Sequence, residues 1–296
     1  MISGLAGSAR SFFLYLLATR TEDTLVCLVP LEEQAYDLHR ELRGFLGPDA
    51  VCLYPSQDLV FWHEGRENSF SRMTRLSTLS RLASGHQQVK VLIATAGSLV
   101  TKVLSPQEFR RQTLTLAVKQ EINLEKTMRR LVELGYQRCQ VVTDPGSFGL
   151  RGGVLDVYPP DQTEPFRLEL WADEIESIRS FDPLTQRSGK KLTSVSISPA
   201  GGTGSGQAAH LLDYVSQDSL VFLDERREFE RCFHRQARRQ EELLAAAKEK
   251  GFKTDDMDAL FTWDEVEALI NRHPVIYHAF FPGQLNIQPL EFYQHI

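Results

Sequence analysis

Short apolar runs that alternate with helical patterns constrain the fold of this chain more than any other feature. Residues 24–30 form an almost continuous apolar run, and residues 31–46 then follow a helical pattern. An unbroken apolar run indicates a strand buried on both faces, which is typical of parallel sheets covered by helices on both sides. The sequence therefore predicts an α/β fold with a parallel sheet. Further apolar runs lie at 51–54, 89–95 and 219–224, and further helical patterns at 68–84 and 229–250.

A different pattern interrupts this alternation after Ser105-Pro106. Residues 114–118 favour a strand, residues 123–134 favour a helix, and residues 150–181 favour a β-hairpin, which is α+β organisation. Residues 201–206 are polar and rich in glycine, a composition typical of flexible linkers. We therefore expect an α/β domain interrupted by an inserted α+β domain. The expected boundaries are 1–106 and 198–296 for the α/β domain and 107–197 for the insertion.

The predicted hairpin carries an unusual outward face. Strand alternation places the apolar side chains of residues 166–170 on one face and Arg167, Glu169 and Trp171 on the other. A tryptophan between charged residues is uncommon on the solvent side of a strand, and Trp and Arg dominate the energetics of protein–protein interfaces. Two interpretations follow: a docking surface, or an ordinary surface strand whose Trp171 is covered by another element.

The N-terminal loop lies where a phosphate-binding loop would precede the first helix of an α/β domain. A working loop has the pattern G-x-x-x-x-G-K-[ST], in which glycine wraps the phosphates, lysine reaches them and the hydroxyl holds Mg²⁺. Here Ala9 and Arg10 replace the second glycine and the lysine, while Ser11 keeps the hydroxyl. Alanine is disfavoured at positive φ, and a guanidinium does not replace a lysine conservatively.

Downstream, residues 220–225 are an apolar run that ends in two acids, like the strand that holds magnesium and activates water in such enzymes. We therefore predict the relic of a nucleotide site. A buried strand that merely ends in two solvent-facing acids is the alternative. The candidate residues of the degenerate nucleotide site are Gly4, Gly7, Ala9, Arg10, Ser11, Asp224 and Glu225.

Composition disfavours several other classes of function. The formal net charge of -6 argues against non-specific nucleic-acid binding by the whole surface. The four cysteines lack C-x-x-C spacing and the eight histidines lack H-x-H or H-E-x-x-H spacing, so we predict neither a metal site nor a disulfide framework. No apolar run reaches the ~18 residues that cross a bilayer. We therefore expect no membrane partner, and a reduced, cytoplasmic setting.

Four ordered words in the hairpin region carry a family resemblance. They are Arg151–Pro159 (RGGVLDVYP), Arg167–Glu169 (RLE), Asp173–Arg179 (DEIESIR) and Phe181–Thr185 (FDPLT). The region resembles the UvrA-interacting domain that UvrB shares with the bacterial transcription-repair coupling factors (the Mfd family). Because the words occur in order with compatible spacing, the resemblance is far more specific than a lone glycine motif.

The resemblance implies a UvrA-docking surface at named positions. Arg151, Arg167 and Glu169 resemble the UvrA-contacting arginines and glutamate, and Trp171 lies where coupling factors show an exposed phenylalanine. One departure is Gly149, where UvrB has a further arginine. The resemblance therefore does not extend to this one UvrB contact. In an alternative interpretation, Arg151 only pairs with an acid across the hairpin, either Asp156 or Glu169.

The resemblance also implies a function and a fold. Coupling factors have a UvrB-like, P-loop NTPase-like α/β module whose loop is degenerate, and they recruit nucleotide excision repair to stalled RNA polymerase. The expected partner of this chain is UvrA. RNA polymerase and DNA would be bound by other domains of the family, and ATP and Mg²⁺ by its motor, of which no motif series is visible here. We therefore expect no catalysis and no cofactor in this chain.

Two further interpretations remain. The chain could be a UvrB-like DNA-dependent ATPase or helicase subunit of the excision nuclease, but Ala9 and Arg10 argue against this. Residues 54–81 are also too few to hold the long DNA-threading hairpin of UvrB. Alternatively, the chain could be a divergent module that keeps the fold and has lost UvrA.

Overall fold

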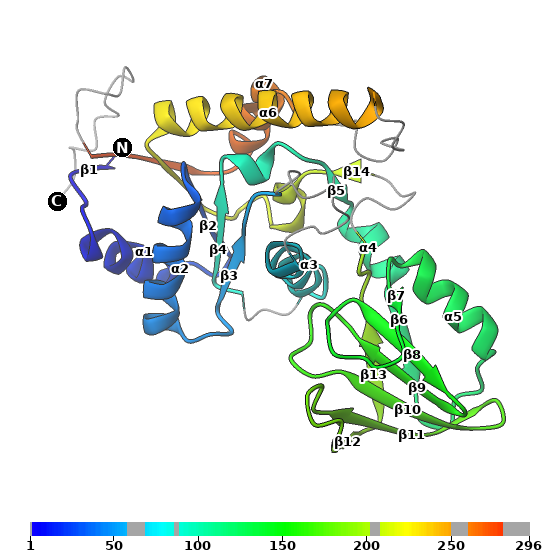
Figure 1. The fold of residues 1–296 in the computed structure, drawn as a ribbon. Coiled ribbons are helices and arrows are strands. Elements are labelled where there is room, and N and C mark those ends of the chain that lie inside the picture. Colours follow the sequence, from blue (N-terminus) through cyan, green and yellow to red (C-terminus); the bar gives the residue numbers. More distant parts are fainter. Residues whose placement is uncertain (1, 58–68, 86–88, 202–207, 250–259, 281–296) are drawn as a thin grey trace. The chain divides into compact units, whose positions relative to one another are not determined.

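Figure 1 shows a computed structural model of the chain, which describes residues 2–57, 69–85, 89–201, 208–249 and 260–280. The chain divides into two compact units. The first unit comprises residues 1–71, 86–102 and 210–296, and the second comprises residues 72–85 and 103–209. Residues 202–206 of the predicted linker, and residues 58–68 of the stretch compared with the UvrB hairpin, lie outside the described residues.

A six-stranded sheet forms the centre of the first unit, and every strand in it is parallel to its neighbours. This confirms the predicted α/β class with a parallel sheet. The neighbouring interior strands β2 and β4 are buried along their whole length, as their continuous apolar sequences predict. The strand order is β1 (Ile2–Ser3), β16 (Val275–Ala279), β15 (Val221–Asp224), β2 (Leu25–Val29), β4 (Val91–Thr95) and β3 (Val51–Tyr54).

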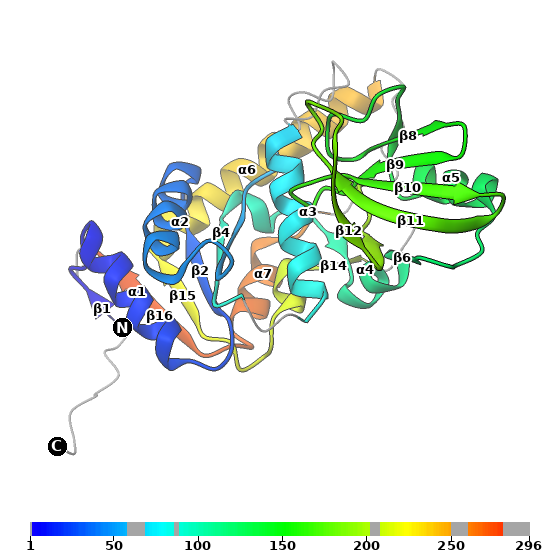
Figure 2. The ribbon, with the colours of Figure 1, turned by 90° about the horizontal axis from the view of Figure 1, so that it is seen from below.

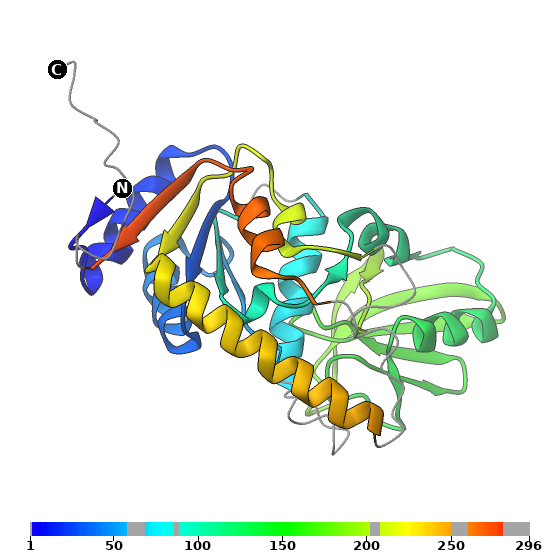
Figure 3. The same cartoon turned by 90° about the horizontal axis from the view of Figure 1, so that it is seen from above.

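Helices cover both faces of this sheet. On one face, α1 and α2 contribute Leu14 and Leu38 to a core that also contains Phe222 of the sheet. On the other face lie α6 and α7, as Figure 3 shows with α6 in front of the strands. The rings of Phe233 and Trp263 pack between these two helices, with 5.5 Å between their centroids. The helices of the first unit are α1 (Ser8–Arg20), α2 (Glu32–Leu46), α6 (Arg226–Glu249) and α7 (Trp263–Ile270), with 3-10 turns at Gly97–Leu99 and Leu211–Tyr214.

A second six-stranded sheet organises the second unit (Figure 2). All neighbouring strands are antiparallel except β7 and β8. The order is β12 (Ser188–Leu192), β11 (Glu174–Phe181), β10 (Phe166–Trp171), β9 (Val154–Tyr158), β8 (Ser147–Arg151) and β7 (Gln137–Arg138). Two strand pairs, β6 (Leu114–Ala117) with β13 (Ser194–Ile197) and β5 (Val103–Leu104) with β14 (Ala208–Ala209), and the helices α3 (Ser69–Ala83), α4 (Pro106–Gln112) and α5 (Leu124–Glu133) complete it.

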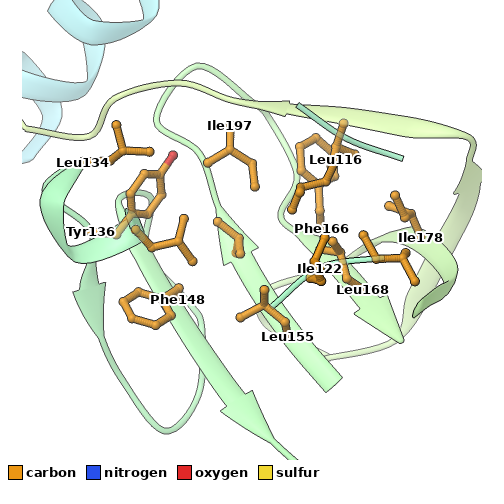
Figure 4. Close-up of a cluster of buried hydrophobic side chains, with 14 of the residues drawn as sticks. Leu116, Ile122, Leu134, Tyr136, Phe148, Leu155, Phe166, Leu168, Ile178 and Ile197 are labelled. Atoms are coloured by element: carbon orange, nitrogen blue, oxygen red, sulfur yellow. The ribbon is translucent and has the colours of Figure 1, made fainter. Parts of the chain in front are cut away.

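One face of this sheet carries the core of the second unit. Leu150, Leu155, Leu168, Ile178 and Leu192 stand opposite one another on five neighbouring strands, so they form an apolar row across the sheet. The cluster in Figure 4 extends from this row to residues of α5 and of the strand pair β6–β13. The predicted inward side chains of residues 166–170 therefore do face a core.

Two glycines of the Arg151–Pro159 segment, Gly152 and Gly153, occupy positions where a larger residue is sterically disfavoured. Gly152 has φ of 60° in the two-residue turn between β8 and β9, a conformation that favours glycine. A Cβ atom on Gly153 would lie 2.9 Å from the carbonyl oxygen of Leu170. The turn therefore brings the backbone of β9 close to the end of β10, beside Trp171.

The helix α3 groups mostly with the second unit, although the sequence predicts that residues 68–84 belong to the α/β domain. Arg72 donates a hydrogen bond to the carbonyl oxygen of Ala200. Ser80 donates one to the Asp161 carboxylate at 2.5 Å. These contacts with later residues tie α3 to the second unit, and no local pattern in residues 68–84 encodes them. The predicted insertion at 107–197 stays a prediction.

Candidate docking surface and nucleotide site

The face of the second sheet opposite its core carries most of the predicted docking residues. Directly opposite residues of neighbouring strands point to the same face of a sheet. In each strand, the residue next to the one in the apolar row therefore points to the outer face, and these residues together form a second row. This charged row consists of Gly149, Asp156, Arg167, Arg179 and Lys191, and the next outer row contains Arg151, Val154, Glu169 and Ser177.

Asp156 joins two of the predicted docking residues. Its carboxylate is buried and accepts hydrogen bonds from Nε and Nη2 of Arg167, both at 2.8 Å, in a bidentate pair. Arg151 Nη2 reaches the same carboxylate at 3.1 Å. The alternative in which Arg151 pairs with an acid across the hairpin therefore holds for Asp156. Even so, the Arg151 side chain is 52% exposed, so it also remains accessible to a partner.

Arg167 is largely enclosed by its neighbours, whereas the sequence predicts that it is exposed. Its side chain is only 14% exposed and lies over the ring of Phe181, 4.4 Å from the ring centroid. Its Nη1 and Nη2 also donate to the backbone and side-chain oxygens of Gln186 at 3.2 and 3.3 Å. The hydrogen bond with Asp156 raises the pKa of Arg167 above its ordinary value. Arg167 therefore stabilises the surface through these contacts and does not project from it.

Trp171 projects from the surface and Glu169 does not. Trp171 is 78% exposed at the end of β10, before a tight turn in which Ala172 has φ of 51°. The interpretation in which another element covers Trp171 is thus wrong for the described part of the chain. Glu169 is half-buried and accepts a hydrogen bond from Ser177 on the next strand.

Two notable residues of the second unit were not among the predicted site residues. Asp156 is the one acid in the apolar strand β9, and this was the available signal. Leu184 is 88% exposed in the Phe181–Thr185 word. The turn is held by Asp182, whose carboxylate accepts the backbone N–H groups of Leu184 and Thr185 at 2.8 Å each. These bonds lower the pKa of Asp182, that to Thr185 the most.

The candidate nucleotide residues come together in the first unit, where the side chains of Arg10 and Asp224 pair with each other and Ser11 and Glu225 bond to other residues. Gly4 and Gly7 have φ of 79° and 51° in the loop before α1, and Ala9 and Arg10 lie in the first turn of that helix. Arg10 Nη1 lies 2.5 Å from Asp224 Oδ2, and His278 Nδ1 lies 2.6 Å from Asp224 Oδ1. Sequence reasoning missed His278, which follows Asp224 by 54 residues and had no local signal.

This geometry leaves Asp224 little capacity for a metal ion. Both carboxylate oxygens are occupied, by a guanidinium and by an imidazole that stacks on Phe222. The Ser11 hydroxyl donates to Glu41, and Glu225 accepts the backbone N–H of Phe280 at 2.5 Å. Burial raises the pKa of the neighbouring Cys27 thiol; Arg10 opposes this rise and Asp224 adds to it.

Within the part of the chain that the structure describes, no group of three or more His, Cys, Asp or Glu side chains is placed to hold a metal ion. Likewise, none of the helices described has the length and apolar character needed to cross a bilayer.

Comparison with known proteins identifies relatives. The UvrB interaction domain family matches residues 114–202. The chain is 34% identical over 201 residues to a transcription-repair-coupling factor of Bacillus subtilis, and 35% identical over 203 residues to that of Myxococcus xanthus. A third, from Staphylococcus haemolyticus, is 30% identical over 222 residues. These matches cover 68%, 67% and 75% of this chain, but it spans only 17–18% of the length of the relatives.

Proposed function

Because the chain carries a UvrB interaction domain and is homologous to transcription-repair-coupling factors over about two thirds of its length, we propose that it is a docking module for UvrA. The UvrA-binding surface is the outer face of the second sheet together with the turn at Trp171. Within a longer coupling factor, this module recruits nucleotide excision repair to stalled RNA polymerase. RNA polymerase and DNA bind elsewhere in that protein.

The observation that carries this proposal is that an exposed tryptophan and a pre-oriented arginine lie at the same end of the sheet. The buried Asp156 carboxylate holds Arg151 in place while half of its side chain stays exposed. A restrained arginine loses less side-chain entropy on binding a carboxylate than a free one. Trp171 adds a large apolar area close by, since Arg151 and Trp171 both lie at the hairpin ends where Gly153 approaches Leu170. Trp and Arg are the residue types that most often dominate an interface.

We further propose that the first unit is a degenerate P-loop NTPase-like domain and a non-catalytic relic, into which the UvrA-binding domain is inserted. The loop–helix arrangement of Gly4 to Ser11 and the acid at the end of β15 support this kinship. Arg10 in place of the lysine, bonded to Asp224, supports the loss of ATP and magnesium binding. We place the protein in the cytoplasm, in keeping with its four free cysteines.

Binding to UvrA tests the proposed surface. We expect the wild-type chain to bind UvrA with micromolar or tighter affinity in isothermal titration calorimetry. The double variant Arg151→Ala/Arg167→Ala leaves the buried Asp156 unpaired, so its fold is first confirmed by circular dichroism. The folded variant should lose roughly 2–4 kcal/mol of binding free energy, which is a ~30- to 1,000-fold weaker Kd.

A matched control is Lys126→Ala/Arg129→Ala on α5, which removes the same charge from the same unit and should bind like the wild type. Equal binding by the Arg151/Arg167 variant would place the interface elsewhere. A wild-type chain that does not bind UvrA would refute the docking function.

Nucleotide binding tests the alternative of a UvrB-like ATPase. We expect calorimetry with Mg·ATP to show no saturable binding at micromolar concentrations, because Arg10 and His278 occupy both oxygens of Asp224. Micromolar affinity that Ser11→Ala abolishes would favour the ATPase. A Thr19→Ala variant, altered farther along the same helix, serves as the control.

A further inference from the structure

The outer face of the second sheet holds more cations than its acids neutralise. In the charged row, Arg167 on β10 stands directly opposite Arg179 on β11, and Arg179 stands directly opposite Lys191 on β12. Asp156, beside Arg167, is the only acid of the row. Like charges directly opposite one another destabilise a sheet, so an arrangement of three adjacent cations calls for a compensating anion.

Asp156 does not compensate Arg179 and Lys191. Both of its oxygens bond Arg167, and Arg151 takes up one of them in addition. Glu169, in the neighbouring outer row, accepts from Ser177. Among the residues that the structure describes, neither Arg179 nor Lys191 forms an ion pair or a side-chain hydrogen bond, and the Nε atom of Arg179 is buried without an acceptor.

The backbone presents these two cations rigidly. Ile178 and Leu192, one position along from Arg179 and Lys191, point to the opposite face and pack into the core. The side chains of Arg179 and Lys191 are therefore fixed at their base to the outer face, in line with Arg167. Their row runs parallel to the row of Arg151, which begins the proposed docking surface.

We propose that Arg179 and Lys191 extend the docking surface across β11 and β12, and that they receive an acidic segment of the protein partner. This proposal rests on the proposed function. It adds a second, carboxylate-binding half to a surface whose first half is Arg151 and Trp171.

The chemistry of the row favours carboxylates of a protein over nucleic-acid phosphates. Neighbouring strands lie ~4.8 Å apart, so Arg179 and Lys191 form a compact pair that suits one or two carboxylates. Glu169 lies on the same face in the next outer row and would repel a continuous phosphate backbone that ran across both rows. A carboxylate between Arg179 and Lys191 also relieves their mutual repulsion, so it is bound more strongly there than at an isolated cation.

The test is UvrA binding by the full chain carrying Arg179→Ala/Lys191→Ala, measured by calorimetry at two salt concentrations. We expect at least tenfold weaker binding and a smaller loss of affinity with added salt than for the wild type. Lys190→Ala is the matched control, because Lys190 is an exposed lysine on the same strand whose parity points it to the other face. It should bind within about twofold of the wild type.

The free energy of unfolding distinguishes a binding role of Arg179 and Lys191 from a structural one. Removal of Arg179 and Lys191 relieves like-charge opposition, so urea unfolding of the double variant should show unchanged or higher stability. Wild-type affinity in the Arg179/Lys191 variant, with loss in the Arg151/Arg167 variant, would overturn the extension and leave the docking function intact. No binding by the wild type would overturn both. Binding of single-stranded DNA that the double variant loses would overturn the assignment to an acidic protein segment.

Discussion

Replacing Asp156 by alanine is expected to lower the free energy of unfolding of the second unit by about 3–5 kcal/mol. Asp156 is buried and is the bidentate partner of Arg167, whose own side chain is 14% exposed. Without the carboxylate, the guanidinium over the Phe181 ring loses its bidentate partner and keeps only the weaker attraction of Glu169. Arg151 contributes less to this loss, because solvent screens an exposed ion pair.

Urea unfolding followed by circular dichroism, with hydrogen exchange of peptides from β8 to β11, measures this loss. The control Glu176→Ala removes an exposed acid from the same sheet and should change stability by less than about 0.5 kcal/mol. The double variant Asp156→Ala/Arg167→Ala should be less destabilised than the sum of the single variants, because no charge is left unpaired. Additive effects would contradict the pairing.

The same cluster links stability to binding. Asp156→Asn keeps the shape of the side chain and an acceptor oxygen but removes the charge, so it should fold and yet leave Arg151 less firmly held. We expect its affinity for UvrA to fall without the full loss of stability seen in Asp156→Ala. Asp156 is in this sense a positioning residue of the proposed surface.

Replacing Asp224 by alanine should destabilise the first unit by a similar amount, about 3–5 kcal/mol. Asp224 and His278 are both buried, and Arg10 closes the third side of the cluster. The cluster connects α1, β15 and β16, so its loss should loosen the edge of the sheet at which β1 pairs with β16. Removing a buried acid that pairs with other side chains lowers the free energy of unfolding, whereas removing an unpaired acid from an empty metal site does not.

Hydrogen exchange of peptides from β15 and β16 measures this effect within the first unit. Asp218→Ala, which removes an exposed acid just before β15, is the control and should match the wild type. Unchanged protection in Asp224→Ala would show that Arg10 and His278 are satisfied without the carboxylate. Such a result would reopen the possibility that Asp224 serves a bound magnesium ion.

The predictions from sequence were strongest for the elements and weaker for the site. The continuous apolar run at β2 predicts a buried parallel strand, because only a strand covered on both faces tolerates apolar side chains at every position. Alternation along β10 predicts which side chains face the core, because its period of two is a property of the strand itself. Alternation does not predict whether an outward residue is exposed. Arg167 and Trp171 lie on the same strand, and a ring, a turn and a carboxylate enclose only Arg167.

The sequence by itself determined the α/β class of the first unit, the core face of the hairpin and the family words, since these follow from local periodicity and from residue identity. The tertiary structure alone decided which charges meet. Arg10 and Asp224 are 214 residues apart in the chain, and Asp156 meets Arg167 only through the register of β9 on β10. Pairing of this kind depends on strand order and register across the sheet, which no single segment encodes. Because of this pairing, the acid and the arginine of the predicted nucleotide site bond to each other. Of the predicted docking residues, Arg151 and Trp171 remain exposed, at the edge of the surface.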